Sequence, residues 1–300
     1  MSIVLRTTNL CKKYGNKMVS DNISITINKG DIYGFVGRNG AGKTTLMRQI
    51  LGLAQPTSGA VQLFEKMKLV DARKKIGSLI ESPAIFKNCS AFENMKRFAI
   101  LTNNTDDEIR EILDYVGLGD TGRKKAGQFS LGMRQRLGIA IALLGNPDFL
   151  VLDEPINGLD PKGIMEVRDL ILKLNKEKGI TFMISSHLLE ELSKIATCYG
   201  FISDGKIIEE ITAKELYEKC ADRIKVVVDR PEEAIKELQS FLPKELIHLY
   251  EGNVYIDSVV EQSAKINKFL IEKGFSVKEI YIHSISLEEY FLRKVDEQVE

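Results

Sequence analysis

The sequence predicts an α/β protein with a mostly parallel central sheet, followed by a smaller α+β domain. Two apolar segments, DIYGFV (31–36) and FLVLDEP (149–155), are typical of parallel strands buried on both faces. A helical pattern follows each of them, as the alternation of strands and helices in such a sheet requires. Beyond residue 220, strand and helix patterns follow the order βαββαβ, which favours a small ferredoxin-like sandwich.

Composition narrows the range of functions. The chain has 300 residues, which allows one large domain and one small one, or two domains. It carries 42 Lys and Arg and 42 Asp and Glu, so its zero net charge argues against binding nucleic acid through bulk charge. No apolar run approaches the roughly 18 residues that span a bilayer, and the N-terminus has no signal-peptide pattern. The four scattered cysteines indicate free thiols in a reducing compartment.

A glycine-rich loop at residues 37–45 is the most specific motif. GRNGAGKTT matches G-x-x-x-x-G-K-[ST] and lies between a predicted strand and a predicted helix. Its glycines let consecutive backbone N–H groups face phosphate oxygens, and the helix N-terminus adds partial positive charge. We expect Lys43 to bind the β- and γ-phosphates of a nucleotide and the Thr44 hydroxyl to ligate Mg²⁺.

The residues before this loop are predicted to be β structure. Within residues 2–36, the segment ISITIN (23–28) alternates so that its three isoleucines share one face. Asn16-Lys17 is predicted to be a turn, and Tyr14 lies just before it. Its ring could stack on a nucleotide base or be a half-buried strand aromatic, and spacing alone leaves both open.

Shorter elements follow the loop. The patterns indicate a strand at 60–64, a helix at 71–77 and a strand at 78–80, directly before Glu81. A carboxylate at the carboxyl end of a strand in an α/β sheet points at the ligand crevice. Glu81 is therefore a candidate site residue.

Residues 90–145 are predicted to be mostly helical. Thr105 and Glu108 have the spacing of a capping box that begins a helix. The next helix begins near Ser130 and Gly132. Such an N-terminus is either an ordinary N-cap or a second anion site.

Two carboxylates end the apolar segment 149–155. Asp153 is placed to hold Mg²⁺ opposite Thr44, directly or through water. Glu154 is placed to polarise an attacking water. The sequence thus predicts a metal ligand and a general base at one strand end.

Another predicted strand, ITFMIS (180–185), is followed by His187. A lone histidine is usually structural, but this one follows the carboxyl end of a parallel strand, which favours a role in the site.

Asp160 and Pro161 begin a helix as N-cap and first residue. Asp204-Gly205 indicates a type I′ hairpin turn within residues 200–210.

From residue 2 to about 215, these motifs in their order resemble the ATP-binding subunits of ABC transporters. GRNGAGKTT resembles the Walker A loop, FLVLDE the Walker B strand, SLGMR (130–134) the signature, NGLD (157–160) the D-loop, and His187 the switch histidine. The resemblance implies a P-loop NTPase core with a RecA-like mixed sheet, an antiparallel β subdomain and an α-helical subdomain. We place the ATP-binding domain at 1–220, its helical subdomain at about 86–146, and an accessory domain at 221–300.

The resemblance also implies roles for individual residues. It implies that ATP is bound by Tyr14, Gly37, Arg38, Asn39, Gly40, Ala41, Gly42, Lys43, Thr44 and Thr45. It implies that the ATP of a second protomer is contacted by Ser130, Leu131, Gly132 and Met133, with Asp160 in the D-loop. It assigns catalysis to Glu154 and His187, and Mg²⁺ to Thr44, Glu81 and Asp153.

Three motifs depart from the family pattern. Arg38 replaces a common proline of Walker A, and Phe129 and Leu131 replace the first leucine and first glycine of the signature. Glu81 replaces the usual glutamine of the Q-loop, within LIESPAIF, which is similar to bacitracin- and lantibiotic-resistance exporters. A carboxylate can still face Mg²⁺ there, because hard cations take oxygen ligands.

The resemblance implies a Mg²⁺-dependent ATPase that powers export of an antimicrobial peptide or drug through a separate permease. It implies a homodimer that closes on ATP, cytoplasmic and peripheral at the inner face of the membrane. The alternative is a non-transport ATPase acting on ribosome or nucleic acid, but the chain has one ATPase domain, no heptad run and zero net charge. An inactive nucleotide sensor is disfavoured by Lys43, Asp153, Glu154 and His187. His248 and His283, in the accessory domain, are interpreted as structural.

Overall fold

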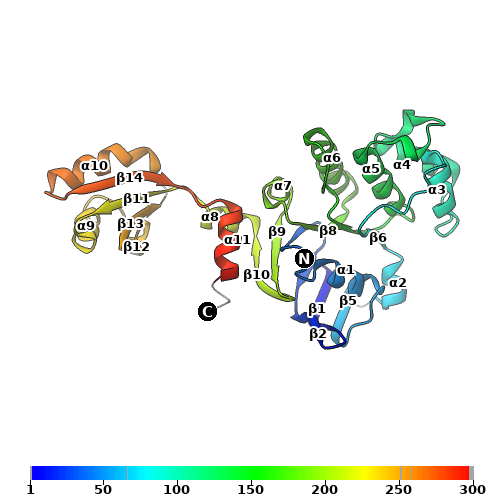
Figure 1. Cartoon of the computed structure of the whole chain (residues 1–300), viewed down its shortest axis with the longest axis horizontal. Helices are drawn as coiled ribbons and strands as arrows, with labels where there is room; N and C mark the ends of the chain where they lie inside the picture. The colour runs from blue at the N-terminus through cyan, green and yellow to red at the C-terminus, as the bar shows by residue number, and fades with distance from the viewer. Residues whose placement is uncertain (1, 66, 251, 258, 297–300) are drawn as a thin grey trace. The chain divides into compact units, whose positions relative to one another are not determined.

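The described residues of the computed structural model divide into two compact units, 2–213 and 214–296 (Figure 1). The described residues are 2–65, 67–250, 252–257 and 259–296. We expected the second domain to begin at 221, whereas helix α8 (Ala213–Lys219) belongs to the second unit from Lys214 on. Within that unit, Lys219 Nζ donates to the hydroxyl of Tyr290 at 3.0 Å, which ties α8 to the last helix.

An antiparallel sheet begins the first unit. Its strands follow the order β2-β1-β3, with β5 also paired to β1: β1 Ile3–Tyr14, β2 Lys17–Ile23, β3 Thr26–Asn28, β5 Ser58–Leu63. The three isoleucines of 23–28, which were predicted to share one face, are all buried. The strand itself is broken, because the buried Thr7 hydroxyl donates to Ile23 O and accepts from Ile25 N, both at 3.0 Å.

The central sheet is mixed and positions the site. Its strand order is β10-β9-β4-β8-β7-β6: β10 Lys206–Thr212, β9 Cys198–Ser203, β4 Ile32–Val36, β8 Thr181–Ser186, β7 Phe149–Asp153, β6 Ile76–Leu79. Neighbours are parallel except β9 and β10, which form the predicted hairpin with Asp204 and Gly205 at positive φ. Every residue of β4, β7 and β8 is buried. Their carboxyl ends lie at one edge, since Val36 pairs with Ser186 and Asp153 with Ser185.

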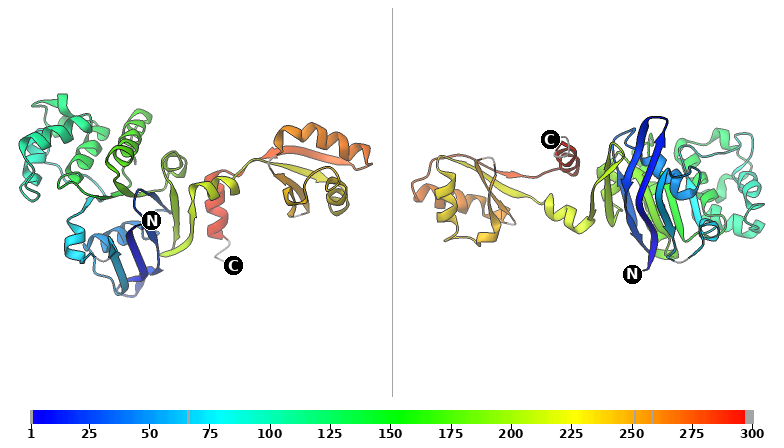
Figure 2. Two further views of the ribbon diagram at one scale, coloured as in Figure 1. Left: turned by 180° about the vertical axis from the view of Figure 1, so that it is seen from behind. Right: turned by 90° about the horizontal axis from the view of Figure 1, so that it is seen from below.

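Helix α1 (Lys43–Leu51) lies in the core shared by the two sheets. Its Leu46, Met47 and Ile50 are fully buried against residues of β1, β4 and β7. Figure 2 shows the blue N-terminal strands beside the yellow-green strands of the central sheet. A backbone hydrogen bond from Asp21 N to Gly205 O joins the two sheets.

The remaining α-helices described in this unit are α2 Leu69–Arg73, α3 Ala91–Ala99, α4 Asp106–Tyr115, α5 Leu131–Ala142, α6 Pro161–Lys178 and α7 Leu189–Ser193. The capping box of Thr105 and Glu108 is present at the start of α4. The predicted helix 71–77 ends early, because β6 already begins at Ile76. A side chain at Gly77 would meet the carbonyl oxygen of Ala142, so this glycine lets α5 pack directly on the strand.

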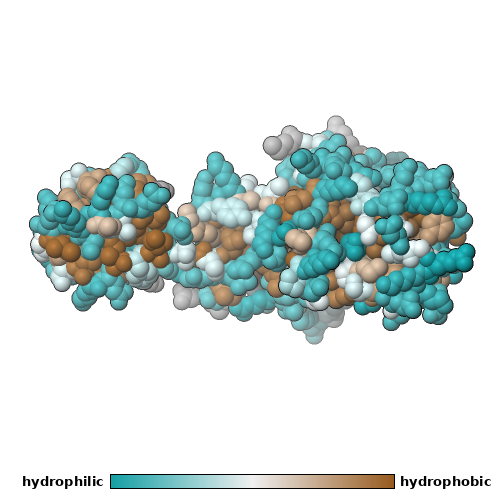
Figure 3. Space-filling view, turned by 90° about the horizontal axis from the view of Figure 1, so that it is seen from above, coloured by the Kyte–Doolittle hydropathy of each residue, from teal (hydrophilic) through white to brown (hydrophobic). Residues whose placement is uncertain are grey.

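The second unit contains an antiparallel sheet in the order β12-β13-β11-β14. Its elements are β11 Arg223–Val228, α9 Pro231–Leu238, β12 Ile247–Tyr250, β13 Asn253–Asp257, α10 Ser263–Glu272, β14 Val277–His283 and α11 Leu287–Asp296. Alternate residues of β11 are buried with residues of α9 and α10 in one core. Hydrophobic residues also reach the surface of this unit (Figure 3). His248 Nε2 lies 3.2 Å from Asp257 Oδ2, and His283 packs edge-on against Tyr255.

None of the helices in the described part of the chain combines the length and hydrophobicity that crossing a membrane requires.

Candidate nucleotide-binding site

The glycine loop joins β4 to α1 and leaves the helix N-terminus open. No side chain within the described ranges caps α1, and its first turn carries no acidic residue. Gly42, the residue before the helix, has φ +108°, and a side chain there would meet Val19 O at 2.6 Å. Glycine is therefore required at this position, and the first N–H groups of α1 remain available to an anion.

A cavity of about 190 Å³ lies over this helix end. It is lined by Val19, Asn39, Gly40, Gly42, Lys43, Thr44, Thr45 and Glu154. Ala41 is instead part of the buried core, and its N–H donates to Arg38 O at 3.1 Å. Gly37 lies against β9, where a side chain would meet Ile202 O at 2.6 Å.

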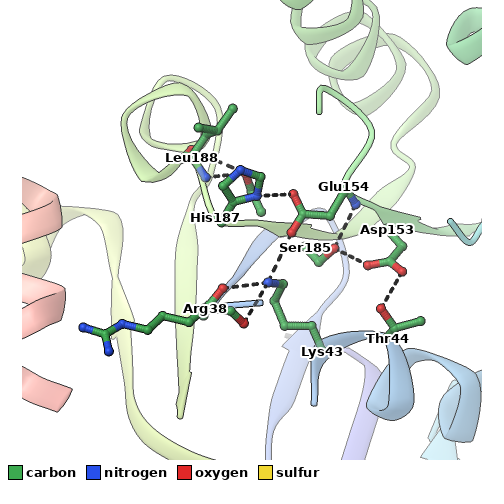
Figure 4. Close-up of polar contacts among 10 residues, drawn as sticks. Arg38, Lys43, Thr44, Asp153, Glu154, Ser185, His187 and Leu188 are labelled. Atoms are coloured by element: carbon green, nitrogen blue, oxygen red, sulfur yellow. Dashed lines mark hydrogen bonds and ion pairs between the residues drawn. The ribbon is translucent and has the colours of Figure 1, made fainter. Parts of the chain in front are cut away.

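Lys43 points across the loop toward the end of β7 (Figure 4). Its side chain is 6% exposed, and its ammonium donates to Gly37 O at 2.6 Å and Arg38 O at 3.4 Å. The same Nζ lies 3.2 Å from Glu154 Oε1. Three oxygens therefore compensate this buried charge, which is the condition for keeping a cation inside a protein.

Thr44 and Asp153 are in direct contact. The Thr44 hydroxyl lies 2.8 Å from Asp153 Oδ2, and Asp153 is 3% exposed. A hydroxyl and a carboxylate beside a phosphate-binding loop form the oxygen donor set that Mg²⁺ uses together with substrate phosphates. The residues present therefore fit this cation.

Glu154 lies between Lys43 and His187. Its Oε2 is 2.8 Å from His187 Nδ1 (Figure 4). Its backbone has φ +49°, and its N–H donates to Ser185 Oγ at 2.9 Å. Among the described residues, Oε1 has the nearby Lys43 charge but no aligned hydrogen-bond donor. Glu154 also lines the cavity, where its carboxylate can take the proton of a water or another ligand.

Two predicted site residues lie apart from this cluster. Tyr14 ends β1 with a half-exposed ring, 4.7 Å from the Lys12 ammonium. Glu81 was expected beside the Mg²⁺ ligands, but its carboxylate binds Arg48 Nη2 at 2.5 Å and is 64% exposed. Arg48 lies one turn after Thr44 on α1, so the helix that carries one expected ligand also holds Glu81 in this ion pair.

The signature and the D-loop meet at the starts of two helices. Ser130 caps α5 by accepting from Met133 N at 3.2 Å, and Asp160 caps α6 by accepting from Gly163 N at 3.0 Å. A methyl group on Gly132 would lie 3.6 Å from Gly163 Cα, whereas Leu131 is 38% exposed. The N-termini of α5 and α6 therefore lie side by side, and none of these residues lines the cavity over α1.

Sequence reasoning did not find Ser185, Arg48 or Val19. Ser185 carried a weak signal, because a small polar residue ends an apolar strand next to Ser186 and His187. Its partner depends on the order of strands in the sheet, which the sequence did not give. Arg48 and Val19 look like ordinary helix and strand residues, so they had no sequence signal.

Comparison with known proteins agrees with this geometry. A family model described as ABC transporter matches residues 20–157. The bacitracin transport ATP-binding protein BcrA of Bacillus licheniformis is 41% identical over 303 residues, with 98% of both chains covered. The lantibiotic transport ATP-binding protein SrtF of Streptococcus pyogenes is 46% identical over 209 residues, with 69% of this chain and 90% of that protein covered.

A solved structure shares the fold of the first unit. A bacterial ABC transporter cassette solved as a dimer superposes with a TM-score of 0.63 at 25% identity, covering 70% of this chain and 98% of that chain. The predicted α/β fold with a P-loop NTPase core is thereby confirmed. Relatives match nearly the full length of this chain. In the structure, the glycine loop, the Walker B strand and His187 also come together at one edge of the central sheet. The chain therefore belongs to the ABC transporter family, as one of its ATP-binding cassettes.

Proposed function

We propose that this chain is a Mg²⁺-dependent ATPase that drives a separate membrane permease. The observation that carries the proposal is the convergence of Lys43, Glu154 and His187 beside the Thr44–Asp153 pair, at one edge of the central sheet. A phosphate-binding helix end, an oxygen donor set for a cation and a carboxylate next to a histidine are the parts that phosphoryl transfer to water needs.

Each side chain has a role in this proposal. Lys43 leaves the loop carbonyls to bind the β- and γ-phosphates. Thr44 and Asp153 would hold Mg²⁺, which would neutralise phosphate charge. Glu154 accepts the proton of the attacking water, and His187 orients the Glu154 carboxylate through its 2.8 Å contact. Tyr14 stacks on the base of the nucleotide, since its ring is exposed at the end of β1.

The signature residues act across a dimer. Ser130, Leu131, Gly132 and Met133 begin α5, whose N-terminus is separate from the cavity over α1 within one chain. A second copy, placed head to tail, would bring this N-terminus to the γ-phosphate of ATP bound at the first, with Asp160 beside it. ATP then joins the two copies, and hydrolysis releases them.

The transported substrate is proposed from the relatives. The names of the two curated relatives assign them to bacitracin and lantibiotic transport. We propose that this chain serves export of such an antimicrobial peptide, from the inner face of the cell membrane. No observation on the described residues favours the ribosome or nucleic acid as the target.

The test is the Glu154→Gln variant, with the exposed Glu190→Gln as a matched control. Loss of a general base should lower ATP turnover by about 10²–10⁴-fold, while ATP still binds. Mass in solution should shift from monomer to dimer when Mg-ATP is added to Glu154→Gln. Turnover at the wild-type rate would contradict the assigned role. In the host, the same variant should raise sensitivity to bacitracin or a lantibiotic, and unchanged sensitivity to both would contradict the substrate.

A further inference from the structure

Ser185 connects the two carboxylates of the site and has no role in the proposal above. It is the second-last residue of β8 and pairs with Asp153 of β7 across parallel strands. Paired residues of neighbouring strands point to the same face of a sheet. The fold therefore brings the Ser185 side chain beside Asp153, with full burial.

The Ser185 hydroxyl makes two hydrogen bonds with fixed directions. It accepts from Glu154 N at 2.9 Å and lies 2.5 Å from Asp153 Oδ1 (Figure 4). Because a backbone N–H can only donate, the proton of the hydroxyl is directed to Asp153. The other Asp153 oxygen, Oδ2, faces the Thr44 hydroxyl at 2.8 Å.

We propose that Ser185 is a positioning residue for the Mg²⁺ site. It fixes the rotation of the Asp153 carboxylate, so that Oδ2 faces Thr44 and the space for the cation. It also holds the backbone of Glu154 in its left-handed conformation, at φ +49°. This inference rests on the proposed function, since it concerns the cation of the same site.

Removing the hydroxyl should lower the affinity of the site for Mg²⁺ without abolishing binding. In Ser185→Ala, the buried Oδ1 of Asp153 loses its donor, and the carboxylate is no longer fixed in rotation. Partners that orient a metal ligand typically change metal affinity by about 10–100-fold when they are removed. Ser185→Thr keeps the hydroxyl and should restore the affinity. Nucleotide affinity in EDTA should not change, because Lys43 and the glycine loop are intact.

The experiment is a calorimetric titration of Mg²⁺ into the full chain saturated with a non-hydrolysable ATP analogue. Thr181→Val is the matched control, because Thr181 is also fully buried in β8. Its hydroxyl accepts from Gly30 N at 3.0 Å, at the opposite end of the strand. We expect Ser185→Ala to weaken Mg²⁺ binding about 10–100-fold and Thr181→Val to leave it unchanged.

Each outcome decides the question. Wild-type Mg²⁺ affinity in Ser185→Ala, or equal weakening in Thr181→Val, overturns the positioning role. If Ser185→Ala does not unfold cooperatively, Ser185→Cys, which keeps the volume and weakens the donor, takes its place in the same comparison. A wild-type chain that binds Mg²⁺ with the analogue but hydrolyses no ATP would refute the proposed function while the Mg²⁺ titration still tests Ser185.

Discussion

Two glycines of α5 should respond in opposite ways to a methyl group. At Gly132 the added carbon would meet Gly163 Cα at 3.6 Å, which is ordinary van der Waals contact. At Gly138 it would meet Pro83 Cγ at 2.9 Å and Leu79 Cδ1 at 3.0 Å, so neighbouring groups would have to move. The variants Gly132→Ala and Gly138→Ala therefore make the same change in one helix, without steric conflict at Gly132 and with it at Gly138.

The free energies follow from these contacts. Alanine is more favourable than glycine in a helix by about 0.5–1 kcal/mol, so Gly132→Ala should stabilise the chain slightly. Overpacking a core costs about 1–3 kcal/mol, so Gly138→Ala should be destabilised despite the same helix gain. For a unit of this size, 1 kcal/mol shifts the melting temperature by about 2–4 °C. Calorimetry without nucleotide should show Gly132→Ala at or above the wild type and Gly138→Ala below it.

The same variants test why Gly132 is a glycine. Under the proposed dimer, the N–H groups at the start of α5 face a phosphate of the second copy, and a methyl group would block that approach. Gly132→Ala should therefore weaken ATP-dependent dimerisation of the Glu154→Gln chain while its melting temperature does not fall. If Gly132→Ala melts as low as Gly138→Ala, the fold itself needs the glycine and this reasoning is refuted.

Three further predictions concern stability. Without nucleotide, Lys43→Met should destabilise the chain by about 1–3 kcal/mol, because it leaves the Glu154 carboxylate without its cation. In calorimetry, adding Glu154→Gln to this variant should restore part of the melting temperature, and a double variant that melts no higher would contradict the pairing. Thr105→Ala should cost about 1 kcal/mol by loss of the helix cap, and Thr105→Ser, measured in the same melting series, should not. Burial raises the pKa of Glu210, although a hydrogen bond from Tyr33 lowers it in part. The folded chain therefore binds this proton more strongly than the unfolded chain does. Stability is lost as the pH rises from the unfolded pKa of about 4.3 through the raised pKa of the folded state. The melting temperature of Glu210→Gln relative to wild type should thus increase between pH 4 and pH 7, and a decrease would contradict the direction.

The sequence predicted the fold class because its strongest patterns are local. Continuous apolar strands, the glycine loop and the capping box of Thr105 each depend on neighbouring residues, and all are present. The misplaced boundaries depend on distant residues. The hydroxyl of Thr7 interrupts the strand at 23–28, and pairing with Leu150 of β7 makes Gly77 part of a strand.

The candidate site shows the same division. Lys43, Thr44, Asp153, Glu154 and His187 were chosen from motifs, and the sheet brings them together at one edge. The contacts that the sequence did not predict involve residues that belong to no motif. The ion pair of Arg48 holds Glu81, and Ser185 lies between the two carboxylates only because β7 and β8 are adjacent.

The position of Glu154 has a consequence for the timing of hydrolysis. In the protein without nucleotide, its carboxylate is the counter-ion of Lys43, 3.2 Å away. The same carboxylate is the proposed base. A phosphate that draws the Lys43 ammonium away would remove that counter-ion and leave Glu154 Oε1 open to a water molecule. Binding of the nucleotide would thus release the carboxylate that the hydrolysis step uses.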